Sequence, residues 1–220
     1  NGPVGLKMET NYPWEGKVKL TIDPVKKSVF KLFLRMPGWM YNVVAPGGLY
    51  VVKQEGDDGV PDHFDPDLLV NGKKVEYKIQ GGYLVAEREW KKGDQLELTI
   101  PMDVKLVGSR PELKQDHQRV AIQRGPLVYC VEGTDNNGKA WNIIVPEGTT
   151  FETIDYKVLD ESVKAITAVV PVVTVGEDGQ SLKTERKKII AIPYYAWANR
   201  GKNEMQVWLP VRINDVKVNY

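Results

Sequence analysis

The chain has 220 residues, of which 42% are hydrophobic and 27% charged, as is ordinary for a folded globular protein. Its 30 basic and 29 acidic residues give a formal net charge of +1, so no field of one sign is expected and nucleic acid is excluded as a partner. No apolar run reaches the roughly 18 residues of a membrane span, and the segment NGPVGLKMET lacks the features of a signal peptide. We therefore expect no membrane partner.

Alternation of apolar and polar residues dominates the chain and predicts strands that are buried on one face. It is clearest at residues 17–22 (KVKLTI), 30–36 (FKLFLRM) and 95–102 (QLELTIPM). Turn residues separate these runs, and two dipeptides, Asn71-Gly72 and Asp178-Gly179, are typical of tight hairpins because both residues tolerate positive φ. The pattern favours antiparallel sheets.

Helical periodicity is nearly absent. Residues 156–168 are the best helix candidate, but their Thr, Val and Ile side chains fit a strand equally well. We predict an all-β protein with two tandem antiparallel β-sandwich domains of jelly-roll-like type. The Gly-, Pro- and charge-containing segment 105–116 follows a completed strand, which places the domains at residues 1–105 and 106–220.

Five segments, in order along the chain, carry a resemblance to a known family. They are TNYPWEGKV (10–18), LRMPGW (34–39), WKKGDQLELTIPM (90–102), RVAIQRGPLVYCVE (119–132) and IPYYAWANRGKNEMQVWLP (192–210). Together they resemble the middle and C-terminal β-domains of glycoside hydrolase family 127, whose founding activity is β-L-arabinofuranosidase. Residues 40–68 resemble an insertion into that pattern, and residues 211–220 extend beyond its usual end.

The resemblance implies that the catalytic machinery lies elsewhere. The family's zinc–thiolate site belongs to an (α/α)6 barrel upstream of the matched region, and none of its residues can be placed on this chain. We therefore expect no catalytic residue, metal or cofactor here, and no activity from this chain alone. The parent would be a bacterial glycoside hydrolase, periplasmic or secreted rather than cytoplasmic, and this region would brace its barrel. The alternative is an autonomous carbohydrate-binding module whose partner is a plant or microbial glycan.

Aromatic side chains are the best candidates for a contact surface, because their faces stack on the apolar faces of sugar rings. The candidates for carbohydrate or interdomain contact are Trp14, Trp39, Tyr194, Tyr195, Trp197, Asn199 and Arg200. The competing interpretation is that these aromatics fill the cores or pack on the barrel.

Three other features favour ordinary structural roles. The single cysteine, Cys130, lies on an apolar strand and is expected to be a small buried hydrophobe. Glu87 and Glu89 share a strand face and are expected to face solvent rather than to act as a glycosidase pair. The 40–68 insertion is rich in acidic residues and is expected to be a solvated loop, although its oxygens could also hold calcium. The candidate ligands are Glu55, Asp57, Asp58, Asp62, His63, Asp65 and Asp67.

Overall fold

The computed structural model describes residues 2–53, 66–178 and 181–216. The chain forms two compact units, each of which is described by itself. The first unit takes in the chain up to Val43 and a later segment that carries β5 to β9 and ends at Met102. The second takes in the segment from Val44 that carries β4 (Tyr50–Lys53), and then the chain from Asp103 onward. The sequence-based division at residue 105 had assigned β4 to the first domain.

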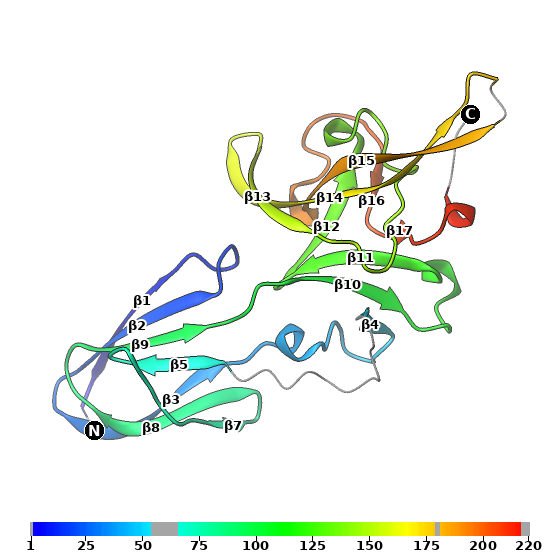
Figure 1. Ribbon diagram of the computed structural model, residues 1–220. Helices are drawn as coiled ribbons and strands as arrows, with labels where there is room; N and C mark the ends of the chain where they lie inside the picture. Colours follow the sequence, from blue (N-terminus) through cyan, green and yellow to red (C-terminus); the bar gives the residue numbers. More distant parts are fainter. Residues whose placement is uncertain (1, 54–65, 179–180, 217–220) are drawn as a thin grey trace. The chain divides into compact units, whose positions relative to one another are not determined.

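The first unit has two antiparallel sheets (Figure 1). Among the described residues, the larger sheet runs in the order β1 (Val4–Thr10), β2 (Lys17–Pro24), β9 (Asp94–Thr99), β5 (Asp67–Val70) and β6 (Lys73–Lys74). The smaller runs in the order β3 (Ser28–Arg35), β8 (Tyr83–Trp90) and β7 (Lys78–Gln80).

One apolar core joins these two sheets into a sandwich. Leu20, Ile22 and Leu96 from the larger sheet and Leu84 and Trp90 from the smaller belong to the same buried cluster. The alternating positions of the sequence provide this face, as the period-two pattern predicts. The Trp90 indole nitrogen donates to the Phe30 carbonyl at 3.1 Å, so this large side chain is buried without losing its hydrogen bond.

Tight backbone contacts fix the turns of the first unit. A Cβ on Gly16 would lie 1.7 Å from the Ile100 carbonyl oxygen, so only glycine fits where the turn after β1 meets the end of β9. Asn71 and Gly72 have φ of 51° and 76° and join β5 to β6, which confirms the predicted two-residue hairpin.

A buried carboxylate lies beside that hairpin. Asp94 is 1% exposed and accepts hydrogen bonds from the Asn71 side-chain amide at 2.9 Å and the Lys91 backbone N–H at 3.0 Å. The Asn71 carbonyl oxygen in turn accepts from the Gln95 N–H at 2.9 Å. This group, the Asp94 knot, satisfies a buried charge with neutral donors only.

The second unit contains one continuous antiparallel sheet. Within the described residues its order is β13 (Glu152–Val158), β14 (Glu161–Val175), β15 (Leu182–Pro193), β12 (Leu127–Glu132), β11 (Arg119–Arg124), β10 (Val104–Ser109) and β4. β16 (Met205–Gln206) pairs with β12, and β17 (Leu209–Pro210) with β11. Figure 1 shows β14 and β15 as a long hairpin.

Both faces of this sheet are covered. Val131, Ala191 and Ile166 stand in register across β12, β15 and β14 and belong to the main core of the unit. Cys130 and Ile192, which pair with each other on the opposite face, are also fully buried. The short 3-10 turns η3 (Gly133–Asp135) and η4 (Tyr194–Ala196) contact β15 and β12 respectively.

The all-β class is confirmed, and the helix candidate at 156–168 is not a helix. That segment contains the end of β13 and the start of β14, which pair around a turn where Leu159 has φ of 54°. The β-branched side chains there favour the strand. Every helical element in the described ranges is a 3-10 turn of three or four residues, including η1 (Gly38–Tyr41), η2 (Lys114–Asp116) and η5 (Ile213–Asp215). No described helix has the length and apolar character needed to cross a membrane.

Candidate functional site

A turn of exposed aromatic residues follows β15. Pro193 ends the strand, and Tyr194, Tyr195 and Trp197 come next with exposed fractions of 43%, 55% and 36%. The Tyr194 and Trp197 rings stack on each other with centroids 6.0 Å apart and planes 12° from parallel. Each ring therefore covers one face of the other, and Tyr195 stands free beside them. We call residues 194–197 the aromatic turn.

A buried ionic group holds the chain immediately after the aromatic turn. The Arg200 guanidinium forms a bidentate pair with Asp135, at 2.7 and 2.6 Å, and also contacts Glu132. The side chains of Glu132 and Asp135 are 0% and 2% exposed, and that of Arg200 is 13% exposed. The Tyr156 hydroxyl donates to Asp135 at 2.7 Å. We call Glu132, Asp135, Arg200 and Tyr156 the ionic network.

The ionic network fixes the backbone of the aromatic turn. The Glu132 carboxylate accepts a hydrogen bond from the Ala198 N–H at 3.1 Å, one residue beyond the aromatic turn. The Asn199 amide donates to the Ala196 carbonyl at 3.2 Å. The first contact ties the turn to the end of β12, and the second closes the turn on itself, so the backbone that carries the exposed rings is held at both points.

The electrostatics of the network leave no reactive group. Hydrogen bonding to Asp135, supported by Glu132, holds the pKa of Arg200 above its usual value despite burial. Burial, and then the Glu132 charge, raise the pKa of the Cys130 thiol to about 12. A thiol with this pKa is protonated at neutral pH and is not a nucleophile. Cys130 is thus a buried hydrophobe, as the sequence predicts.

The seven predicted contact residues do not form one surface. Tyr194, Tyr195 and Trp197 are exposed together. Arg200 directs its guanidinium to Glu132 and Asp135, and the exposed Asn199 donates to the Ala196 carbonyl within the turn. Trp14 and Trp39 belong to the first unit, and both are half-buried. Trp39 packs against the core of that unit from η1, and the Trp14 N–H donates to the Asn11 carbonyl at 2.8 Å in the turn after β1.

Three residues of the ionic network, Glu132, Asp135 and Tyr156, were not anticipated from the sequence as site residues. Glu132 and Asp135 lie more than sixty positions before Arg200, and no local spacing relates them to it. The only available signal is that Glu132 directly follows the apolar strand segment VYCV, where a charge is unexpected unless it is paired.

The larger exposed apolar side chains of the first unit lie on its strands rather than at the two tryptophans. Leu6 and Met8 on β1 are 56% and 64% exposed. They pair with Ile22 and Leu20, which are buried, so β1 extends the core face of its sheet beyond the core.

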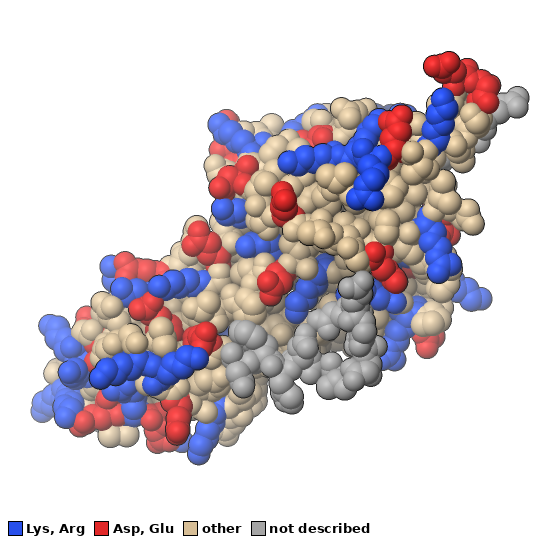
Figure 2. Space-filling model, in the orientation of Figure 1, with Lys and Arg blue, Asp and Glu red and all other residues tan. Residues whose placement is uncertain are grey.

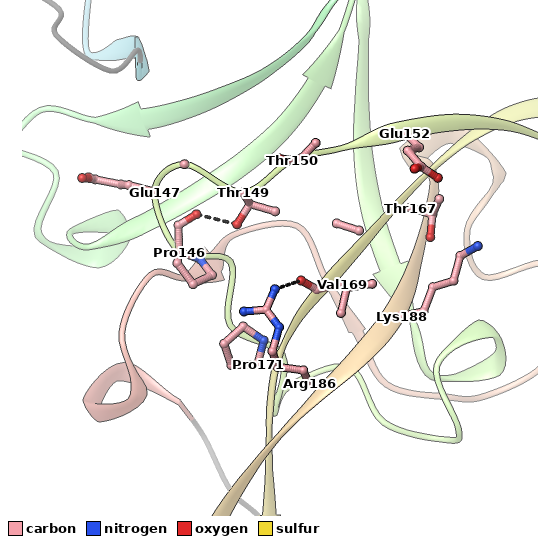
Figure 3. Close-up of a pocket in the computed structure, with 12 residues that line it drawn as sticks. Pro146, Glu147, Thr149, Thr150, Glu152, Thr167, Val169, Pro171, Arg186 and Lys188 are labelled. Atoms are coloured by element: carbon pink, nitrogen blue, oxygen red, sulfur yellow. Dashed lines mark hydrogen bonds between the residues drawn. The ribbon is translucent and has the colours of Figure 1, made fainter.

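The second unit also has an open pocket of about 420 Å³ between the 146–150 loop and strands β13, β14 and β15 (Figure 3). The Arg186 guanidinium lies in its centre and donates to the Val169 carbonyl at 2.8 Å. Thr149, Thr167 and Lys188 also line it. The pocket is separate from the predicted contact residues, none of which lines it.

The remaining sequence candidates have structural explanations or lie outside the described residues. Glu87 and Glu89 are exposed, and they pair with Lys31 at 3.7 Å and Lys27 at 2.7 Å. In the insertion, Asp67 starts β5 and pairs with Lys74 at 2.7 Å. Glu55, Asp57, Asp58, Asp62, His63 and Asp65 lie outside the described residues. The described residues contain no group of three His, Cys, Asp or Glu side chains that could hold a metal ion.

Charge is distributed evenly on the visible surface. On the face shown in Figure 2, basic and acidic side chains are interspersed and neither sign dominates a large area.

The fold is thus a β-sandwich unit and a second unit built on one antiparallel sheet, both of the all-β class. Residues 1–102 match the model of the GH127 middle domain of β-L-arabinofuranosidase, and residues 104–210 match the glycoside hydrolase family 127 C-terminal domain. The chain therefore belongs to glycoside hydrolase family 127 and comprises its middle and C-terminal domains.

Solved structures and a sequence relative from the same family support this assignment. A GH127 β-arabinofuranosidase superimposes with a TM-score of 0.85 at 36% identity, over 96% of this chain and 32% of its own. A GH127 β-L-arabinofuranosidase from Geobacillus stearothermophilus T6 gives 0.76 at 33%, over 94% and 30%. The non-reducing end β-L-arabinofuranosidase of Bifidobacterium longum subsp. longum is 30% identical over 93% of this chain and 30% of its own length. The chain thus spans about a third of these relatives.

Proposed function

We propose that this chain is the non-catalytic accessory region of a family 127 glycoside hydrolase, and that it braces a catalytic domain acting on β-L-arabinofuranosides. The observation that carries the proposal is the nearly complete match of this chain to one third of a β-arabinofuranosidase. The remaining two thirds of such relatives are where the resemblance puts the catalytic barrel.

The chemistry of the described residues supports an accessory role. Retaining glycoside hydrolysis needs a nucleophile and an acid/base group that face one sugar carbon. Cys130 is buried with a raised pKa, and Glu132 and Asp135 are both occupied by Arg200. The zinc–thiolate centre implied by the resemblance does not fit these residues either, because Cys130 is the only cysteine and its thiol lies within a strand.

The aromatic turn supports contact with another domain. Three aromatic side chains on a backbone fixed by the ionic network resemble the rigid anchors that dominate protein interfaces. In a bracing role, Tyr195 and the outer face of Trp197 would pack against the catalytic domain.

Two experiments test the proposal. The purified chain should release no chromophore from an aryl β-L-arabinofuranoside. A chimera in which this chain replaces the matched third of the Bifidobacterium longum enzyme should retain that activity. In the chimera, Tyr195→Ser together with Trp197→Ser should lower Tm, while Leu182→Ser, on the exposed tip of the β14–β15 hairpin, should not. Turnover by the chain alone that is lost in Cys130→Ser would contradict the accessory role.

An autonomous carbohydrate-binding module is the second candidate, and the exposure of Tyr194, Tyr195 and Trp197 is the observation that favours it. The two functions differ in what the aromatic turn binds. A binding module would lose glycan affinity on Tyr195→Ser and Trp197→Ser in the isolated chain, whereas a bracing region would lose only the stability of the chimera.

A further inference from the structure

The pocket of Figure 3 has the size of a small-molecule site. Its volume of about 420 Å³ lies within the roughly 300–1,000 Å³ range of ligand pockets. The 146–150 loop forms one wall, and the outer faces of β14 and β15 form the other. Pro146, Pro171 and Val169 supply apolar contacts between the polar groups.

Charged groups in this pocket stand without partners. Glu147, Glu152 and Lys188 are exposed to solvent, and none of them makes a hydrogen bond or ion pair through its side chain with any residue that the structure describes. Neighbouring charges on the same strands do pair, since Lys187 lies 3.0 Å from Glu185 and Lys164 lies 2.6 Å from Asp155. In Figure 3 Glu152, Thr167 and Lys188 gather at one end of the pocket, so a ligand seated there can reach both an acceptor and a donor.

Two threonine hydroxyls of the pocket donate to backbone carbonyls of the protein. The Thr149 hydroxyl donates to the Pro146 carbonyl at 2.6 Å, and the Thr167 hydroxyl donates to the Ile189 carbonyl at 2.7 Å. Each hydroxyl has used its hydrogen. Thr149 is half-buried and keeps lone pairs for a ligand donor, whereas Thr167 is 2% exposed and shapes the pocket without offering its hydroxyl. The Arg186 guanidinium uses one nitrogen for the Val169 carbonyl and keeps other N–H groups.

We propose that this pocket binds a neutral saccharide of one or two rings. Two acidic and two basic side chains line it, so their formal charges cancel and a net charge on the ligand is not favoured. Sugar hydroxyls both donate and accept hydrogen bonds, which suits Glu152 and Thr149 as acceptors and Lys188 and Arg186 as donors. The proline and valine surfaces suit the C–H groups of a sugar ring. The ligand class rests on the proposed function, since glycans are the substrates of such a parent.

The test is a titration of the isotope-labelled full chain, followed by amide NMR signals, with L-arabinose, methyl β-L-arabinofuranoside and a neutral arabino-oligosaccharide as probes. We expect shifts at Gly148, Thr149 and Val169, with millimolar affinity. Glu152→Gln and Lys188→Gln should each weaken binding by about tenfold, the loss typical of a hydrogen bond to a charged group. The matched controls are Asp155→Asn and Lys187→Gln, which remove paired charges on the same strands and should leave affinity unchanged.

Each other outcome overturns the proposal. No shift with any probe means that the pocket does not bind saccharides. Shifts confined to the aromatic turn place the sugar at the other surface. Stronger binding of glycine or galacturonic acid than of the neutral probes means that the pocket selects charge. Because the titration needs no catalytic domain and the chimera assay needs no sugar in this pocket, either proposal can fail without the other.

Discussion

The two units treat a buried carboxylate in opposite ways. In the first unit, Asp94 is surrounded by neutral donors, the Asn71 amide and the Lys91 backbone N–H. In the second, Glu132 and Asp135 share one guanidinium from Arg200. The Asp94 knot joins the turn before β9, where Lys91 is three residues from Asp94, to the β5–β6 hairpin, where Asn71 is 23 residues from Asp94. The ionic network joins segments more than sixty residues apart and fixes an exposed turn.

The Asp94 knot and the ionic network differ in how many charges they bury and in what their geometry fixes. Neutral donors satisfy a carboxylate without requiring a second buried charge, so the Asp94 knot desolvates one charged group rather than three. The network buries two carboxylates and a guanidinium, whose desolvation offsets much of their attraction. Such a group contributes geometric specificity rather than net stability, and here the geometry that it specifies is the aromatic turn.

The largest effect should come from removing the cation of the network. Arg200→Met leaves Glu132 and Asp135 buried with no counter-charge, and we expect a loss of about 3–5 kcal/mol in the free energy of unfolding. Urea unfolding measures it. The control is Arg186→Met, because Arg186 is exposed. Equal losses in the two variants would mean that the network contributes no more than a surface arginine.

Asp94→Asn should have a smaller effect. The new amide places N–H groups where Asn71 and Lys91 already donate, and we expect a loss of about 1–3 kcal/mol at neutral pH. Glu97→Gln in the neighbouring part of β9 is the control, since that side chain pairs with Lys17 at the surface. Intact stability in Asp94→Asn would show that the hydrogen bonds of the knot are dispensable.

The Asp94 knot should also be sensitive to acid. Burial alone would raise the pKa of Asp94, but the hydrogen bonds from Asn71 and Lys91 outweigh it and lower the pKa. A carboxyl whose folded pKa is depressed contributes stability above its unfolded pKa of about 3.9 and loses it as the pH falls through the folded value. The stability gap between the native chain and Asp94→Asn should therefore be full above about pH 5 and close below pH 4. A gap that persists in strong acid would contradict this.

A substitution at Cys130 tests the apolar packing beside the ionic network. Cys130→Ser puts a hydroxyl in a fully buried apolar position beside Glu132, and we expect a loss of about 1–2 kcal/mol. Cys130→Ala is the control for lost volume. The native thiol, with a pKa of about 12, should react with thiol reagents at pH 8 only after unfolding. Rapid labelling of the folded chain would show that the strand opens readily.

The smallest effect should come from the surface ion pairs. Lys17 and Glu97 lie 2.6 Å apart across β2 and β9, and the Lys17 side chain is 62% exposed. Exposed pairs of this kind gain little over solvation by water. Lys17→Gln should leave the urea midpoint unchanged at moderate salt. A clear shift that disappears on adding salt would show that this pair is stronger than its exposure suggests.

Local patterns in the sequence account for most of the secondary structure. Alternation at 17–22 and 95–102 predicts β2 and β9, because a strand with one buried face must repeat every two residues. Asn71-Gly72 predicts its hairpin through the φ angles that those two residues allow. The segment 156–168 is ambiguous in the sequence because it contains the end of one strand, a turn and the start of a second strand. Taken as one continuous segment, its apolar residues do not follow a single strand period.

The candidate site was harder to anticipate. The exposure of Tyr194 and Tyr195 follows from tertiary packing, which their sequence neighbours do not determine. Arg200 was predicted to contact carbohydrate or another domain because it follows the aromatic cluster in the sequence, yet its partners come from the end of β12 and from η3. The sequence does not predict the pocket beside β14 and β15, because its charged residues have the pattern of an ordinary solvent-exposed strand. Which of those charged side chains form ion pairs depends on which residues the strand pairing brings together, and this is known only from the structure.

The position of β4 has a consequence for how this region can be handled. β4 pairs with β10 in the second unit, although it lies between strands of the first in the chain. A cut placed at residue 103 would strip β10 of this neighbour and leave a bare hydrogen-bonding edge, which invites association with other chains. The two halves of the chain therefore cannot be exchanged or expressed separately by a single cut at residue 103. A shuffled or truncated version should carry residues 44–53 with the C-terminal half, or be transferred whole.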